Sequence, residues 1–88
     1  MVNEETRNER LMMAFGEHIR MLRKEKGMSM EALADAAEME YSQIAKIEKG
    51  KINTSITTAY RITTALNIPF DRLFAFEIKS DRKSSDTI

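Results

Sequence analysis

The sequence has no cysteine, no long hydrophobic run and no net charge, and each absence excludes a class of protein. Without cysteine, no disulfide and no thiolate metal site can compensate for the small core of an 88-residue chain. No apolar run approaches the roughly 20 residues of a membrane span, and no signal-peptide pattern is present. We therefore expect one soluble, cytoplasmic domain that is stabilised by helix packing and does not enter a membrane.

The 14 basic and 14 acidic residues balance, which argues against a protein that coats nucleic acid non-specifically. Their distribution along the chain is uneven. Residues 17–26 carry four bases and two acids, and residues 46–51 carry three bases and one acid. Residues 28–45, between these segments, carry four acids and no base. A positive patch can form where the two basic segments meet, so this placement mildly favours DNA binding.

Catalytic and metal-binding patterns are also missing. His18 is the only histidine, and the chain contains no HExxH, CxxC or glycine-rich phosphate loop. A nucleophilic or metal site would need partners that converge on His18, and the sequence offers none. We expect His18 to be a half-exposed packing residue, and we expect no enzyme activity, cofactor or metal.

Apolar residues spaced three or four apart predict a series of helices. The first begins between residues 4 and 12 and ends at Gly27, with an inward stripe of Met12, Phe15, Ile19 and Leu22. The second covers residues 30–37, with Ser29 as its N-cap. The third covers residues 41–49 and stops at Gly50, with Glu40 as a cap whose amide Gln43 can reach.

The next segment has two interpretations. INTSITT is rich in β-branched residues and could form a strand. The longer spacing of Ile56, Ala59, Ile62, Thr63 and Leu66 favours a helix between Ser55 and Asn67. A last short helix follows, with Pro69 in its first turn and with Phe70, Leu73 and Phe74. We expect an all-α domain of five helices over residues 11–76. Residues 1–10 form a flexible segment or helix extension, and residues 77–88 a disordered polar tail.

Three separated pieces of the chain stand in a recognisable order and spacing. They are FGEHIRMLRKEKGMSMEALA, the signature Ile44-x-x-Ile47-Glu48-Lys49-Gly50, and residues 55–66 followed by NIPFDRLF. Together these pieces resemble the phage repressor/Cro-like (XRE) helix-turn-helix family. The resemblance covers roughly residues 15–74. It implies a compact, lambda-repressor-like bundle whose third helix enters the major groove of DNA, with members usually acting as dimers on two-fold symmetric operators.

The chain departs from the family pattern around the turn. Glu38 stands where the family usually has glycine, Glu40 replaces the usual Ser or Thr cap, and Met30 replaces a glutamine common in phage members. If Glu38 is left-handed, a non-glycine residue there costs roughly 1 kcal/mol. Glu40 also places a carboxylate near the DNA phosphates.

The resemblance implies two sets of DNA contacts. The residues expected to reach base edges are Tyr41, Ser42, Gln43 and Lys46. The residues expected to contact phosphate are Ser29, Lys49, Lys51, Asn53, Thr54 and Ser55. For both sets, the alternative is that the residues form an ordinary solvated surface and contact no DNA. In the family, an Arg late in the first helix commonly pairs with the signature Glu. We therefore expect a partly buried ion pair between Arg23 and Glu48.

An apolar cluster near the C-terminus contains Phe70, Phe74, Phe76 and Ile78. Some of these residues should cover the core. The family commonly dimerises through this end, so the remaining ones are expected to form a homodimer interface.

We therefore expect a sequence-specific regulator, such as a repressor, that binds a palindromic or pseudo-palindromic site on double-stranded DNA as a homodimer. Phage-type repressors, restriction–modification controllers and antitoxins remain equivalent alternatives. A protein–protein adaptor, which keeps the fold and has weak or no DNA binding, is the alternative from another class. Its best support is the pair of acids at Glu38 and Glu40.

Overall fold

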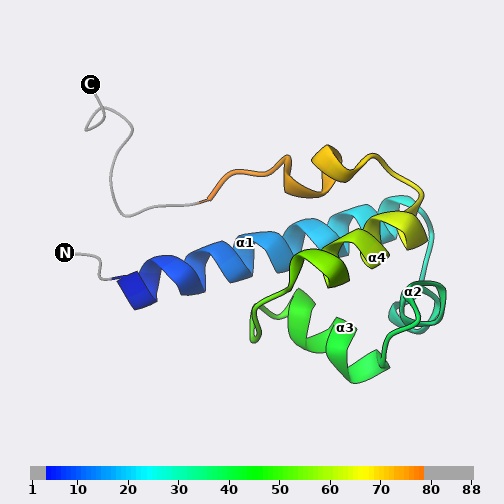
Figure 1. The fold of residues 1–88 in the computed structure, drawn as a ribbon, viewed down its shortest axis with the longest axis horizontal. Coiled ribbons are helices and arrows are strands. Elements are labelled where there is room, and N and C mark those ends of the chain that lie inside the picture. Colours follow the sequence, from blue (N-terminus) through cyan, green and yellow to red (C-terminus); the bar gives the residue numbers. More distant parts are fainter. Residues whose placement is uncertain (1–3, 79–88) are drawn as a thin grey trace.

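The computed structural model describes residues 4–78, which form four α-helices and one 3-10 helix (Figure 1). The elements are α1 (Glu4–Glu25), α2 (Met30–Ala37), α3 (Tyr41–Glu48), α4 (Ile56–Leu66) and η1 (Phe70–Phe74). No residue between 4 and 78 lies in a strand. Residues 52–55 of INTSITT precede α4 and residues 56–58 begin it, which confirms the predicted helix between Ser55 and Asn67. The predicted tail from residue 79 onward and residues 1–3 lie outside the described range.

The fifth predicted helix differs from the expectation. Phe70–Phe74 is a single 3-10 segment, and Pro69 precedes it as the capping residue with φ −64°. Five residues are too few for an α-helix to gain much from its own hydrogen bonds, so packing decides the local geometry. The domain therefore contains four α-helices and a short 3-10 turn.

Local capping chemistry explains where α2 and α4 begin and end. The Ser29 hydroxyl accepts the Ala32 N–H at 3.0 Å, and the Ser55 hydroxyl accepts the Thr58 N–H at 3.1 Å. α4 ends at Asn67, which adopts the left-handed conformation with φ 57°. α2 ends at Glu38, which is also left-handed, with φ 58°. The turn between α2 and α3 therefore carries the backbone strain that a glycine would avoid.

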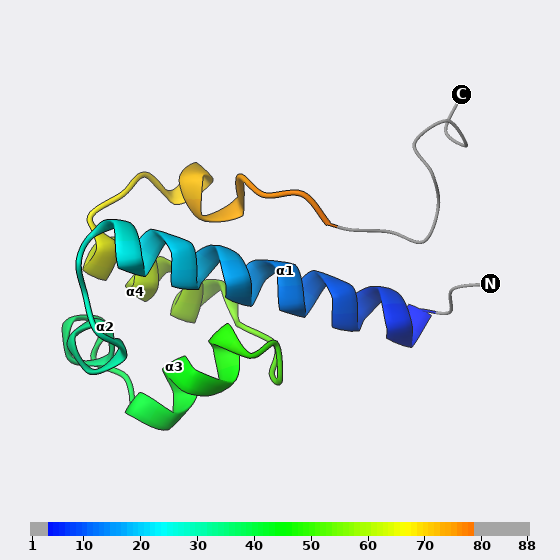
Figure 2. The ribbon, with the colours of Figure 1, turned by 180° about the vertical axis from the view of Figure 1, so that it is seen from behind.

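α1 runs through the middle of the molecule. Figures 1 and 2 show α3 on one side of α1 and η1 on the other, and α1 contacts both elements. All four α-helices and η1 contribute side chains to one core. The members of this core are Phe15, Ile19, Leu22, Leu33, Ala34, Ile44, Ile47, Ala59, Ile62, Leu66 and Leu73.

The backbones of α1 and α3 approach closely at Gly16. A Cβ atom at this position would lie 2.2 Å from the Ile47 carbonyl oxygen and 2.7 Å from the Glu48 carbonyl oxygen. No side chain larger than hydrogen fits there unless the helices separate. Gly16 therefore determines how closely the C-terminal end of α3 lies against α1.

Candidate nucleic-acid interface

α3 buries one side and exposes the other. Ile44 and Ile47 are 0% and 2% exposed, because they face α1 and the core. The four residues expected to contact bases, Tyr41, Ser42, Gln43 and Lys46, are all exposed. The helix therefore offers a phenol, a hydroxyl, an amide and an ammonium group to whatever lies in front of it. Contact between these groups and bases stays a prediction.

The Gln43 side chain also helps to cap α3. Its Oε1 accepts the Glu40 N–H at 3.0 Å, as the sequence suggested. This bond ties the amide to the start of the helix and occupies one of the two acceptor positions of its oxygen. The NH2 group, which can only donate, stays available for a base contact.

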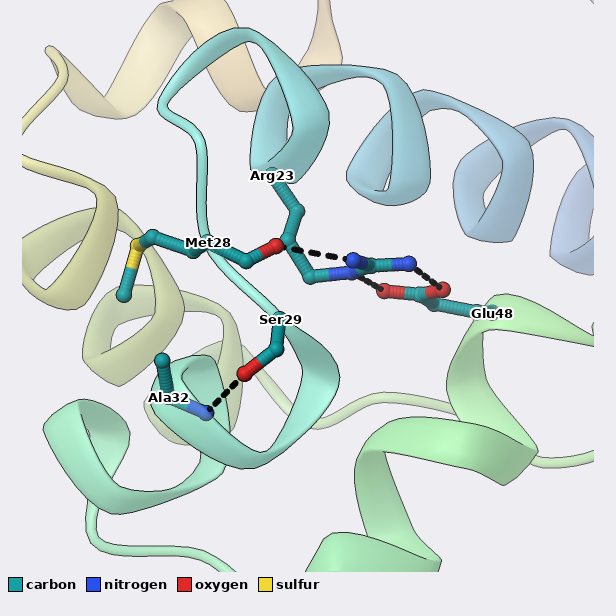
Figure 3. A network of polar contacts seen from close by, with 5 residues as sticks. All are labelled: Arg23, Met28, Ser29, Ala32 and Glu48. Carbon is teal, nitrogen blue, oxygen red and sulfur yellow. Dashed lines mark hydrogen bonds and ion pairs between the residues drawn. The ribbon is translucent and has the colours of Figure 1, made fainter.

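Arg23 connects α1 to α2 and α3, the two helices of the helix-turn-helix motif (Figure 3). Its Nε donates to Glu48 Oε2 at 2.6 Å, and its Nη2 donates to Glu48 Oε1 at 3.0 Å. Its Nη1 donates to the Met28 carbonyl at 2.9 Å, directly before the α2 cap Ser29. The end of α3 and the start of α2 are therefore both attached to α1 through one guanidinium group. The structure thus contains the ion pair that the sequence suggested.

The protonation state of this group is stable. The hydrogen bond to Glu48 raises the pKa of Arg23 above its usual value, and it outweighs the opposing effect of burial. The charge on Arg23 is therefore present at any physiological pH. The carboxylate of Glu48 is held bidentately by this permanent cation, which leaves little of its charge for the surroundings.

The pairing of Arg23 with Glu48 changes the electrostatics of the neighbouring surface. Lys46, Lys49 and Lys51 are exposed at the end of α3 and in the following loop. The negative charge of Glu48, which lies among them in the sequence, is balanced by Arg23. That end of the motif is therefore more positive than its sequence suggests. At the other end of α3, Glu38 and Glu40 are exposed. The surface changes from acidic at the turn to basic at the loop.

The residues expected to contact phosphate fall into two groups. Lys49, Lys51 and Asn53 are exposed, as are the capping residues Ser29 and Ser55. Ser55 also donates its hydroxyl proton to Thr58 Oγ1, at 3.0 Å.

Thr54 differs, because its Oγ1 is buried and lacks a hydrogen-bond partner within the described part of the chain. A phosphate contact from Thr54 would therefore use its backbone amide. All six contacts stay predictions.

The C-terminal apolar cluster is partly exposed. Phe70, Phe74 and Ile78 are 37%, 44% and 50% exposed, as a docking surface would require. Phe76 is packed inward instead, with its ring centroid 6.1 Å from that of Phe15 and 5.3 Å from that of His18. Phe76 therefore belongs to the packed layer beneath the exposed residues of the cluster. Contact between the exposed residues and a second copy stays a prediction.

The expectation about the burial of His18 was wrong. His18 is 8% exposed, not half-exposed, and its Nε2 lies 2.8 Å from the Arg72 carbonyl oxygen. Ile56, the first residue of the spacing that predicted α4, is 70% exposed because the first turn of the helix lies at the edge of the core.

Together with Tyr60, Ile56 forms an outward apolar pair that the sequence reasoning missed. The Tyr60 ring lies 6.1 Å from the Phe70 ring, so this pair adjoins the C-terminal cluster. The i, i+4 spacing of Ile56 and Tyr60 was the available signal.

No helix within residues 4–78 is both long and apolar enough to cross a membrane. Over the same residues, no cluster of three His, Asp or Glu side chains is placed to hold a metal ion.

Comparison with known proteins places this geometry among helix-turn-helix domains. The helix-turn-helix family profile HTH_3 matches residues 19–73. An uncharacterized HTH-type transcriptional regulator of Archaeoglobus fulgidus is 37% identical over 59 residues, which cover 67% of this chain and 84% of the relative. Control protein C.MunI of a Mycoplasma species is 34% identical over 62 residues, with coverages of 69% and 84%.

The transcriptional regulator SutR of Escherichia coli K12 is 31% identical over 52 residues, which cover 59% of this chain. The match spans only 29% of the length of SutR. Among solved structures, the restriction-modification controller protein C.AhdI of Aeromonas hydrophila superimposes with a TM-score of 0.70 at 35% identity. That match covers 72% of this chain and 96% of C.AhdI.

Proposed function

The chain belongs to the helix-turn-helix family HTH_3, and from this premise we propose that it is a sequence-specific, DNA-binding transcriptional regulator. In this proposal α3 enters the major groove, and Tyr41, Ser42, Gln43 and Lys46 contact base edges. The protein acts as a homodimer on a palindromic or pseudo-palindromic site. Relatives named as transcriptional regulators and as restriction–modification controllers support this role over that of an antitoxin.

The observation that carries the proposal is the arrangement of α3. Its polar side is exposed, its apolar side is fully buried, and its end is held to α1 by the pair of Arg23 and Glu48. A helix that reads bases must be both accessible and rigidly placed, because a bidentate contact tolerates little displacement. α3 meets both conditions.

Phosphate contacts would come from the basic end of the motif. Lys49 and Lys51, with Asn53 and the amides at the start of α4, lie on the segment that follows α3. Lysine contacts of this kind make binding depend on salt, because each releases counterions from the DNA. They position the protein and carry no sequence information.

The exposed aromatic cluster supports the dimer. Phe70 and Phe74 are in edge-to-face contact at 5.4 Å, and Ile78 follows them on the chain. An exposed group of large apolar side chains is typical of an interface between subunits. A two-fold dimer would place two α3 helices roughly 34 Å apart, one turn of the double helix.

Selection from a pool of random DNA duplexes tests the proposal. We expect the selected sequences to share two inverted half-sites at a fixed spacing. Binding to the selected sequence should weaken as salt rises. A pool that enriches no shared sequence would contradict the proposal. Sedimentation that finds only monomers at high micromolar concentration, with and without the selected duplex, would contradict the dimer.

A protein–protein adaptor is the second candidate function. The exposed carboxylates of Glu38 and Glu40 favour it, because they flank the start of α3 and would repel DNA phosphates. The selection experiment separates the two functions. An adaptor would enrich no sequence and would bind random duplexes weakly at every salt concentration.

A further inference from the structure

Two hydrogen bonds of Arg72 join η1 to α1, in addition to the packing of Leu73 in the core. The backbone carbonyl of Arg72 accepts a hydrogen bond from His18 Nε2 at 2.8 Å, and its Nη2 donates to Glu25 Oε1 at 2.7 Å. A carbonyl oxygen only accepts, so Nε2 of His18 carries the proton. The two bonds differ in burial. The pair of Arg72 and Glu25 is about half exposed, whereas His18 is buried.

His18 also supports the aromatic cluster through its ring. The His18 and Phe76 centroids lie 5.3 Å apart, and Phe76 in turn contacts Phe15 at 6.1 Å. Phe15 is stacked against Phe74 at 5.7 Å. A connected series of rings therefore runs from buried His18 to exposed Phe74. Aromatic contacts at these distances hold rings in defined orientations.

α1 thus attaches to the two sides of the molecule by separate groups. Arg23 binds the end of α3, and His18 binds η1, which lies on the opposite side of α1 (Figure 1). The two anchors stand five positions apart on one continuous helix. The position of Phe70 and Phe74 relative to α3 therefore depends on the bond from His18 to η1, the stacking of Phe15 on Phe74, and the attachment of α3 to α1 by Arg23.

We propose that His18 is a positioning residue that fixes the aromatic face relative to α3 and so determines which half-site spacing the dimer accepts. The inference rests on the proposed dimer. If two copies meet through Phe70 and Phe74, a rigid link from η1 to α3 allows only one separation of the two α3 helices. A loose link allows several separations of the two α3 helices, and each of them costs little free energy.

The test measures binding of the full chain to duplexes that carry both selected half-sites at five spacings, in steps of one base pair. His18→Phe keeps an aromatic ring on Phe76 and removes the N–H donor. His18→Gln keeps a donor and removes the ring. Glu17→Gln, an exposed change on the same helix, is the matched control.

We expect wild type and Glu17→Gln to prefer one spacing sharply. His18→Phe should reduce that preference by about fivefold, the change in an equilibrium constant that corresponds to the loss of one ordinary hydrogen bond. Its choice of bases within a half-site should stay unchanged, because Arg23 still holds α3. His18→Gln should restore most of the spacing preference. A general loss of structure would instead weaken base choice and spacing choice together. If His18→Phe fails to fold, His18→Leu replaces it in the same comparison.

The outcomes separate this inference from the proposed function. A wild-type protein with no enriched half-site contradicts the proposed function itself. If the wild-type protein binds half-sites without any spacing preference, this result contradicts the dimer and also the proposed role of His18. A sharp wild-type preference that His18→Phe retains within twofold overturns the role of His18 alone.

Discussion

Arg23 and Glu48 form a buried, bidentate ion pair between α1 and the end of α3. The two bonds measure 2.6 Å and 3.0 Å, and the two side chains are 9% and 6% exposed. The chain also contains an exposed ion pair, between Arg72 and Glu25, whose side chains are 46% and 45% exposed. The bond distance of 2.7 Å in the exposed pair is similar, so the two pairs differ mainly in their contact with water.

Glu48→Gln should therefore destabilise the protein far more than Glu25→Gln. Removing one partner of a buried pair leaves an uncompensated charge, which costs about 3–5 kcal/mol, whereas an exposed pair contributes about 0–1 kcal/mol. Urea unfolding of the two variants measures both values. Glu48→Gln should also weaken DNA binding, because α3 loses its attachment to α1. Unchanged melting temperature and DNA affinity in Glu48→Gln would refute this role.

The limits of α2 and α4 could be predicted because short-range chemistry determines them. Ser29, Ser55 and Asn67 cap these helices through hydrogen bonds and backbone conformations that involve only neighbouring residues. The exposed side of α3 could be predicted for the same reason, since Ile44 and Ile47 define the buried side by their spacing alone. Helical periodicity does not require knowledge of which element packs against it.

The features that the sequence did not predict lie where distant elements meet. His18 is buried because η1, 54 residues later in the chain, supplies the carbonyl that it binds. Ile56 is exposed because the core ends one turn inside α4. The buried hydroxyl of Thr54 depends in the same way on how the loop packs. Periodicity states which residues share a face, but it does not state how far a neighbouring element extends along that face.

Gly16→Ala should be strongly destabilising although it replaces glycine inside a helix. The new Cβ would lie 2.2 Å from the Ile47 carbonyl oxygen, so α1 and α3 would have to separate. Overpacking typically costs about 1–3 kcal/mol and occasionally more, and contact with backbone atoms, which cannot rotate away, belongs at the upper end. This cost exceeds the roughly 1 kcal/mol gained in helix propensity. Chemical denaturation gives the free energy of unfolding.

Gly27→Ala is the matched control for this prediction. Gly27 has no atom within 4 Å of an added Cβ, but its φ is +69°. Its replacement should cost only the left-handed strain of an L-residue, about 1–2 kcal/mol. If Gly27→Ala proved more destabilising than Gly16→Ala, close packing of α1 on α3 would not be the main constraint.

Glu38→Gly should stabilise the protein and strengthen DNA binding. Glu38 adopts φ 58°, so glycine removes about 1–2 kcal/mol of strain and loses about 0.5–1 kcal/mol through greater freedom in the unfolded chain. The net gain of about 0.5–1 kcal/mol should appear as a higher melting temperature. Glu38→Gln separates the two effects, because it removes the charge and keeps the strained backbone. It should improve DNA affinity at low salt and leave the melting temperature unchanged.

Lys46→Ala and Lys51→Ala should differ in how they change DNA binding. Lys46 lies on the exposed side of α3, and Lys51 lies in the loop that follows it. Loss of a base contact costs about 1–3 kcal/mol on the selected sequence and relaxes the choice of base at one position. Loss of a phosphate contact weakens binding to all sequences similarly and reduces the slope of affinity against salt by about one. Titrations of each variant with selected and scrambled duplexes, at four salt concentrations, measure both effects. Equal losses on both duplexes for Lys46→Ala would move Lys46 from the base contacts to the phosphate contacts.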